Sequence, residues 1–193
     1  YSNNTSAGTA TVTVTGKGNY TGTKTANFTI NRAPITISAT PYSGTYDGRA
    51  HGISVSVTNV TGASITYCAT QNGTYSSTNP TYTNAGTYTT WYKVTKAGYT
   101  TVTGSKTVAI SKATITVPSS PAAKTFNGSS QNSGITAQAN TSIVTASSTT
   151  SATNAGTYNV VLKLSDTTNY TWSDGTNANK TVTWTINKYN LSN

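Results

Sequence analysis

The residues able to carry chemistry are few in this chain and are spread far apart. Its carboxylate side chains are Asp47, Asp166 and Asp174, and its single histidine is His51. Catalysis requires acids, bases or nucleophiles in positioned pairs or triads, and structural zinc sites require about four ligands together. The sequence therefore predicts that the protein is not an enzyme, with no catalytic residues, no metal site and no cofactor.

Asp47 and His51 are four residues apart around a predicted turn. One interpretation is a charged pair with a function. The other is a turn aspartate whose side chain caps backbone donors, with an exposed histidine beside it. The second interpretation is favoured, because a related turn later in the chain carries Asn127 and Gln131 at the corresponding positions.

Two tryptophans are the candidate ligand-binding residues. Trp91 lies between Thr89 and Lys93 in an alternating run, so it is expected on the polar face of a strand, and Trp172 precedes a turn at residues 173–175 (SDG). Exposed aromatic rings stack on sugars and on partner surfaces. Each ring could instead cover a neighbouring loop or pack at a module junction. A binding site for a glycan or a host surface protein at Trp91 or Trp172 is therefore a hypothesis.

The charge pattern narrows the choice of partners. The formal net charge is +9, but the twelve basic residues occur singly and the excess comes from the scarcity of acids. Nucleic-acid binding proteins gather their basic residues into patches, so no nucleic-acid partner is predicted. No apolar run is long enough to insert into a membrane. A single cysteine, Cys68, excludes an internal disulfide and is expected in the core, in keeping with the sparing use of cysteine by secreted Gram-positive proteins.

Strands are the elements that must position these residues. Apolar and polar residues alternate with period two from Tyr88 to Val94 and from Tyr158 to Leu164. This pattern is typical of half-buried antiparallel strands, and the abundant threonines suit a pleated surface. Three later strands share one predicted core face, formed by Phe28 with Ile30, Val108 with Ile110, and Trp184 with Ile186.

An internal repeat organises the chain. Residues 83–88 (TNAGTY) recur at 153–158, and a degenerate copy (SAGTA) occupies 6–10. An element ending in Tyr-Thr follows each copy, at residues 19–21, 98–100 and 169–171. Each unit then ends alike, at residues 30–32 (INR), 110–112 (ISK) and 186–188 (INK). Successive endings are 80 and 76 residues apart, a length that fits a small sandwich of about seven strands.

The repeat predicts an all-β chain of tandem immunoglobulin-like β-sandwich modules arranged end to end. Residues 33–112 and 113–188 are the complete modules, and the second has a shortened middle and a longer late loop. Residues 1–32 are the C-terminal part of a preceding module, and 189–193 are the start of a next module or a tail. Two or three strands have little core of their own, so residues 1–32 must pack on the next module, pair with another chain or be disordered. The junctions lack Gly/Ser linkers, which predicts a semi-rigid rod.

Four short motifs carry a resemblance to a known family. Residues 46–48 (YDG), 84–88 (NAGTY), 98–100 (GYT) and 110–113 (ISKA) resemble the MBG and YDG bacterial immunoglobulin-like repeats. The resemblance covers nearly the whole chain and is clearest in 33–112, whereas residues 126–128 (FNG) depart from the first motif. It implies an extracellular location at the bacterial cell surface or cell wall. It also implies a structural stalk repeat of an adhesin that projects a distal binding domain, with neighbouring modules of the same chain as its partners. The alternative is an adhesive module that binds glycan or host protein through exposed aromatics.

Overall fold

The computed structural model describes residues 1–192 and is nearly all-β, as the alternating pattern predicts. Helical structure within these residues is limited to one 3-10 turn, η1 (Thr145–Ser147). No helix in the described part of the chain is long and apolar enough to cross a membrane. Asn193, the last residue of the predicted tail 189–193, lies outside the described residues.

The chain divides into two compact units. Unit 1 comprises Tyr1–Ser43, Ala50–Tyr82 and Thr87–Ala109, and unit 2 comprises two short loops, Gly44–Arg49 and Thr83–Gly86, together with the chain from Ile110 onward. This division follows spatial contacts, whereas the boundaries at 32, 112 and 188 follow the sequence repeat and stay predictions. It places the first 32 residues in the same unit as most of the first predicted module.

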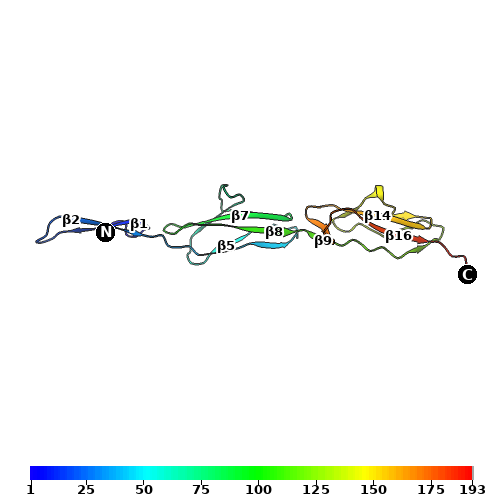
Figure 1. Cartoon of the computed structure of the whole chain (residues 1–193), viewed down its shortest axis with the longest axis horizontal. Coiled ribbons are helices and arrows are strands. Elements are labelled where there is room, and N and C mark those ends of the chain that lie inside the picture. The colour runs from blue at the N-terminus through cyan, green and yellow to red at the C-terminus, as the bar shows by residue number, and fades with distance from the viewer. Residues whose placement is uncertain (193) are drawn as a thin grey trace. The chain divides into compact units, whose positions relative to one another are not determined.

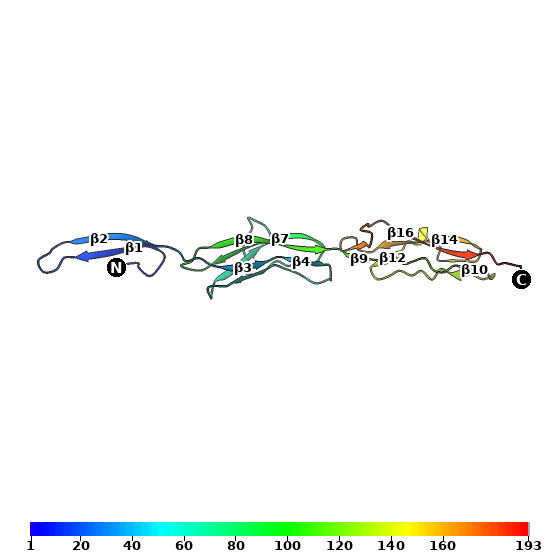
Figure 2. The same ribbon diagram turned by 60° about the horizontal axis from the view of Figure 1, so that its bottom comes forward.

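The strands of unit 1 form small sheets (Figures 1 and 2). Strands β1 (Gly8–Thr15) and β2 (Thr23–Ile30) form a hairpin, and β3 (Ile37–Thr40) pairs with β5 (Ser54–Val57). A four-stranded sheet has the order β4 (Tyr42–Thr45), β8 (Val102–Ser111), β7 (Gly86–Thr95), β6 (Ser64–Cys68), with the ends of some strands counted in unit 2.

Strand β7 shows the predicted alternation. Thr90, Tyr92 and Val94 are buried, whereas Trp91 and Lys93 between them are half-buried on the opposite face. The buried face contributes to a core that also contains Val108. Cys68 is buried, as the sequence predicts, but it lies on the opposite face, beside Trp91. The face carrying Trp91 is the one that a ligand could reach.

The hairpin β1–β2 corrects one prediction. Phe28 is 42% exposed, although its alternation places it on the same predicted core face as Val108 and Trp184. The reason is that two strands form one layer, so no second sheet covers the Phe28 ring. The ring meets the Tyr1 ring edge-on, with their centroids 6.4 Å apart. Ala10, opposite Phe28, is fully buried, and Ser2 bridges to Thr11 beside it.

Unit 2 is built around a four-stranded sheet and two small ones. The larger sheet has the order β10 (Lys124–Thr125), β16 (Lys180–Asn187), β14 (Gly156–Leu164), β12 (Thr141–Ile143). The smaller sheets pair β11 (Gln131–Asn132) with β13 (Ser151–Ala152), and β15 (Tyr170–Trp172) with β9 (Ala113–Ile115). The β10–β16 and β15–β9 pairs are parallel and the others are antiparallel, so the sheets of this unit are mixed.

The core of unit 2 gathers the apolar faces of these strands. From β14 it takes Val160, Leu162 and Leu164, which alternate with more exposed residues as predicted. From β16 it takes Trp184 and its neighbours, and the Trp184 indole N–H donates to the Thr149 carbonyl at 2.7 Å. The prediction that Trp184 is a core residue is confirmed.

Candidate functional site

Trp91 sits on the outer face of the β6–β7 pair. It lies directly opposite Cys68 of β6, and Lys93 lies opposite Thr66 in the same ladder. Residues directly opposite each other in an antiparallel pair point to the same side of the sheet. Trp91, Lys93, Cys68 and Thr66 therefore share one face, and this face is opposite the buried face of β7.

A turn after β6 folds over part of this face. It begins at Thr70, whose carbonyl accepts from the Gly73 N–H at 3.2 Å, and returns to pair Ser76 with Tyr67. A side chain at Gly73 would collide with the Cys68 sulfur, since a Cβ there would lie 2.6 Å from it. The turn thus covers Cys68 closely and leaves Trp91 beside it half-buried.

The turn and the sheet enclose a shallow hollow of about 400 Å³ beside Trp91. We call it the Trp91 hollow. Its lining side chains are those of Gln71, Asn72, Tyr75, Trp91, Thr103 and Ser105. Thr103 and Ser105 come from β8, where Gly104 between them leaves room for Tyr92 on the other face: a Cβ at Gly104 would lie 2.4 Å from the Tyr92 hydroxyl oxygen.

The Trp91 hollow combines aromatic rings with neutral polar groups, and one of its rings also contacts a cation. The Lys93 ammonium lies 5.1 Å from the centroid of the Tyr75 ring, within the range of a cation–π contact, and this contact positions Tyr75 at the edge of the hollow. Two aromatic rings together with amide and hydroxyl groups can stack on a sugar ring and hydrogen-bond its hydroxyls. Trp91 could be recognised from the sequence, but Tyr75 could not, because it joins the hollow only where the turn folds back.

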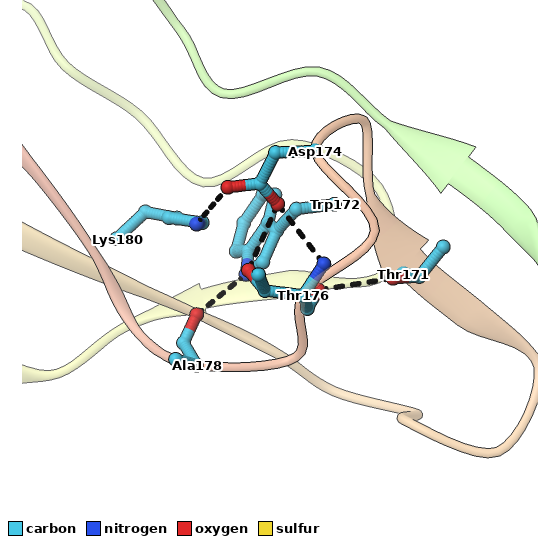
Figure 3. A network of polar contacts seen from close by, with 6 residues as sticks. All are labelled: Thr171, Trp172, Asp174, Thr176, Ala178 and Lys180. Atoms are coloured by element: carbon cyan, nitrogen blue, oxygen red, sulfur yellow. Dashed lines mark hydrogen bonds and ion pairs between the residues drawn. The ribbon is translucent and has the colours of Figure 1, made fainter.

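Trp172 lies in the core of unit 2 and offers no exposed ring face. It is fully buried, and its indole N–H donates to the Ala178 carbonyl at 2.8 Å (Figure 3). Around it, Asp174 accepts from the Thr176 backbone N–H at 3.0 Å and pairs with Lys180, which closes the loop over the ring. The longer late loop of the second repeat therefore encloses a core tryptophan.

Asp174 also illustrates the electrostatics of this loop. Its hydrogen bond from Lys180, and then those from Thr176, lower its pKa from the ordinary 3.8 to about 2. Asp166 has a lowered pKa as well, chiefly because the Asn169 side-chain amide donates to it, at 2.8 Å. Both carboxylates are occupied in shaping loops, and no group of three metal-ligating side chains is found in residues 1–192.

Asn169 is a buried polar residue that sequence analysis did not single out. It is 5% exposed, and its amide joins three partners within unit 2. Its Oδ1 accepts from the Ala85 N–H at 2.8 Å, and its Nδ2 donates to Asp166 and, at 3.2 Å, to Asn84. Both of its polar atoms are thus bonded, which offsets the cost of burying them. The recurrence of Asn84 and Ala85 in the repeat was the available signal.

The turn aspartate Asp47 behaves as the favoured interpretation predicts. Its Oδ1 accepts from the Arg49 N–H at 2.9 Å, and Asn127 accepts from the Ser129 N–H at 3.0 Å in the same way. His51 stacks on the Tyr42 ring with centroids 4.0 Å apart, and its Nε2 lies 3.2 Å from the Tyr42 hydroxyl. Asp47 and Asn127 thus cap equivalent turns. His51 is half-buried against Tyr42, whereas the sequence predicts an exposed histidine.

Comparison with known proteins gives little guidance. Neither a scan against protein-family models nor a search of curated proteins finds a match. Among solved structures, the chain is similar to the Bacteroides ovatus protein SGBP-B of the mixed-linkage glucan utilization locus, solved in complex with a mixed-linkage heptasaccharide. The identity is 14%, the TM-score is 0.26, and the match covers 78% of this chain and 43% of that one. A likeness this weak carries no argument about function.

Proposed function

We propose that the chain is a set of structural repeats from the stalk of an extracellular adhesin at a bacterial cell surface, and that it is not an enzyme. The repeats would be of the MBG/YDG immunoglobulin-like kind, joined end to end as tandem sandwich modules. Their role is to hold a distal binding domain away from the cell wall. This function needs reach and stiffness, and it needs no catalytic group.

The observation that carries this proposal is the equivalence of two repeat boundaries. Ala33 and Ala113 are the first residues of the two complete repeats. In unit 1, the Ala33 N–H donates to the Gly98 carbonyl at 3.0 Å, and in unit 2 the Ala113 N–H donates to the Asn169 carbonyl at 2.9 Å. The same backbone bond therefore fixes the chain where each repeat begins.

A basic side chain reinforces each of these boundaries. Arg32 donates to the Tyr99 carbonyl at 3.2 Å in unit 1, and Lys112 donates to the Thr167 carbonyl at 2.6 Å in unit 2. A junction bonded in this way rotates less freely than a Gly/Ser linker. Restricted rotation at successive boundaries supports a semi-rigid stalk.

Small-angle X-ray scattering tests the stalk. The long strands β1, β7 and β14 contain 8, 10 and 9 residues. Laid lengthwise at ~3.3 Å per residue they span about 90 Å, which corresponds to a radius of gyration of about 26 Å for a rod. A compact body of this chain length would have a radius of gyration of about 16 Å. A value near the compact figure, or a profile typical of freely jointed modules, would rule out a stiff stalk.

The Trp91 hollow supports a second candidate function, an adhesive module for a glycan. Trp91 and Tyr75 supply aromatic faces, and Gln71, Asn72 and the β8 hydroxyls supply hydrogen-bonding groups around them. The turn that completes the hollow, residues 70–76, belongs to the part of the first repeat that is shortened in the second. A glycan site would therefore be a property of one repeat within a structural array.

A glycan array followed by NMR titration tests the adhesive alternative. The expected result is a specific signal that Trp91→Ala abolishes and Trp91→Phe weakens, because Phe keeps part of the stacking surface. Thr87→Ala, an exposed change on the same strand, is the matched control and leaves binding intact. Absence of any specific signal with the folded protein, or a signal that survives Trp91→Ala, removes the hollow as a binding site.

A further inference from the structure

An open apolar hollow lies where β16 ends in unit 2. Its volume is about 640 Å³. We call it the C-terminal hollow, and its lining includes Phe126, Asn127, Ala155, Lys188, Tyr189 and Leu191. Phe126 is 36%, Tyr189 60% and Leu191 88% exposed, so three large apolar side chains meet water here. Clustered exposure of this kind marks an interaction surface.

The repeat identifies counterparts of these residues that already contact another repeat. Tyr46 occupies the position of Phe126 in the first repeat, and Asn84 and Ala85 occupy the positions of Asn154 and Ala155. Tyr46, Asn84 and Ala85 all belong to the two short loops of unit 2. Within that unit they are therefore in contact with the second repeat.

The covering contacts come from one short loop, residues 169–171 (NYT). Tyr46 meets the Tyr170 ring edge-on with centroids 5.5 Å apart. The Ala85 N–H donates to the Asn169 side-chain oxygen, and Asn84 accepts from the Asn169 amide nitrogen. The Tyr46 ring, the Asn84 side-chain oxygen and the Ala85 N–H thus form a receptor for an Asn-Tyr pair.

The segment after β16 repeats the start of a module. Lys188 corresponds to Lys112 and Arg32, both of which bond to a loop carbonyl. Leu191 corresponds to Ile35 and Ile115, which are 7% exposed and half-buried, respectively. Leu191 therefore has the sequence position of a core residue of a first strand, but it is almost fully exposed.

We propose that the C-terminal hollow is the docking site for a further repeat that follows on the same polypeptide. That repeat would use Tyr189–Leu191 as its first strand and present an Asn-Tyr-Thr loop. Its asparagine side chain would accept from the Ala155 N–H, and its tyrosine would pack edge-on against Phe126. This inference rests on the proposed stalk function and names the contact that joins its repeats.

The docking proposal is tested by adding a further repeat to the full chain. A copy of residues 116–188 is attached directly after Leu191, so that residues 189–191 take the place of residues 113–115. Hydrogen exchange of the Ala155 amide is then measured by NMR. The expected result is exchange about tenfold or more slower than in the unextended chain, the size of effect given by one new buried hydrogen bond. The Ala85 amide, which already donates to Asn169, is the internal reference.

A matched variant isolates the recognised side chain. The copy's equivalent of Asn169 is changed to Ala, which is expected to return Ala155 to fast exchange. Ala85 stays protected, because the original Asn169 is unchanged. Protection of the copy's own β14 and β16 amides reports that the copy has folded. A folded copy that leaves Ala155 unprotected, or protection that survives the Asn→Ala change, overturns the proposal.

Two further outcomes are informative. If the added copy does not fold, a copy of residues 36–112 carrying Gly98→Asn is attached at the same point. Failure of both copies to fold after Leu191 also counts against the proposal, because it requires residues 189–191 to act as a first strand. If the unextended chain self-associates and protects Ala155, the occupant is a second copy, and docking of a following repeat is rejected. None of these results depends on the scattering profile that tests the stalk.

Discussion

Replacing Trp172 by Phe is the most direct test of where the second candidate tryptophan lies. The ring is fully buried and its N–H donates to Ala178. Phe has no such donor, so the Ala178 carbonyl loses its partner, which costs about 1–2 kcal/mol. The smaller ring also leaves a cavity that costs about 1 kcal/mol more. The free energy of unfolding of unit 2 is therefore expected to fall by about 2–3 kcal/mol.

Urea denaturation followed by far-ultraviolet circular dichroism measures this change, and hydrogen exchange locates it. The amides of Val160 and Val182 are expected to lose protection, because both residues lie in the core with Trp172. Amides of unit 1, such as that of Val94, are expected to keep theirs. The protein stays folded, since a domain of this size is stable by about 5–10 kcal/mol.

Trp91→Phe is the matched control for the same chemical change. Trp91 is half-buried beside an open hollow, so the unfolding free energy is expected to change by no more than about 0.5 kcal/mol. The reasoning is refuted if Trp172→Phe also costs less than about 0.5 kcal/mol, or if Trp91→Phe costs as much as Trp172→Phe. Loss of a glycan signal in folded Trp172→Phe, with retention in Trp91→Ala, would equally refute it.

Three other perturbations follow from particular contacts. Asp174 has a depressed pKa of about 2, so its stabilising effect is complete above about pH 4 and is lost as the pH falls toward 2. The unfolding temperature measured between pH 5 and 2 should show this loss. In Asp174→Asn, the unfolding temperature should depend less on pH over the same range. Asn169→Ala removes the partner of the Ala85 N–H and is expected to lower the free energy of unfolding by about 1–3 kcal/mol. An unfolding midpoint equal to that of the wild type would show that the hydrogen bonds of the Asn169 amide are dispensable. Gly104→Ala forces Tyr92 to move and is expected to lower the free energy of unfolding of unit 1 by about 1–3 kcal/mol, measured by urea denaturation. An unchanged urea midpoint would contradict the close approach of the two residues.

Much of the strand content could be predicted because it depends on local alternation. The buried faces of β7 and β14 follow the period-two pattern residue by residue, with Val94 and Leu162 fully buried. Trp184 could be assigned to the core because its position in the repeat matches Val108 and because β16 continues the same alternation. The repeat also indicated that Asn127 and Asp47 serve the same turn, and both side chains accept from the backbone N–H two residues on.

What could not be predicted depends on layers and on loops that fold back. Phe28 has a core pattern but sits in a two-stranded hairpin, where no second layer covers it, so alternation alone misplaces it. Trp172 follows no clear alternation, and its burial results from the loop that Asp174 and Lys180 close over it. Tyr75 lines the same hollow as Trp91 only because the turn after β6 folds back, and no short-range pattern encodes that proximity.

The parallel pairing of β10 with β16 has a mechanical consequence. Lys124 and Thr125 pair with Ile186 and Asn187, and the Phe126 N–H donates to the Asn187 carbonyl at 2.9 Å. Tension applied between the beginning and the end of the second repeat pulls these two segments past each other along their length. Their hydrogen bonds are then strained together in shear and cannot open one after another as in a zipper. Part of the resistance to stretching thus comes from a patch of only a few residues, which are loaded together when the repeat is pulled.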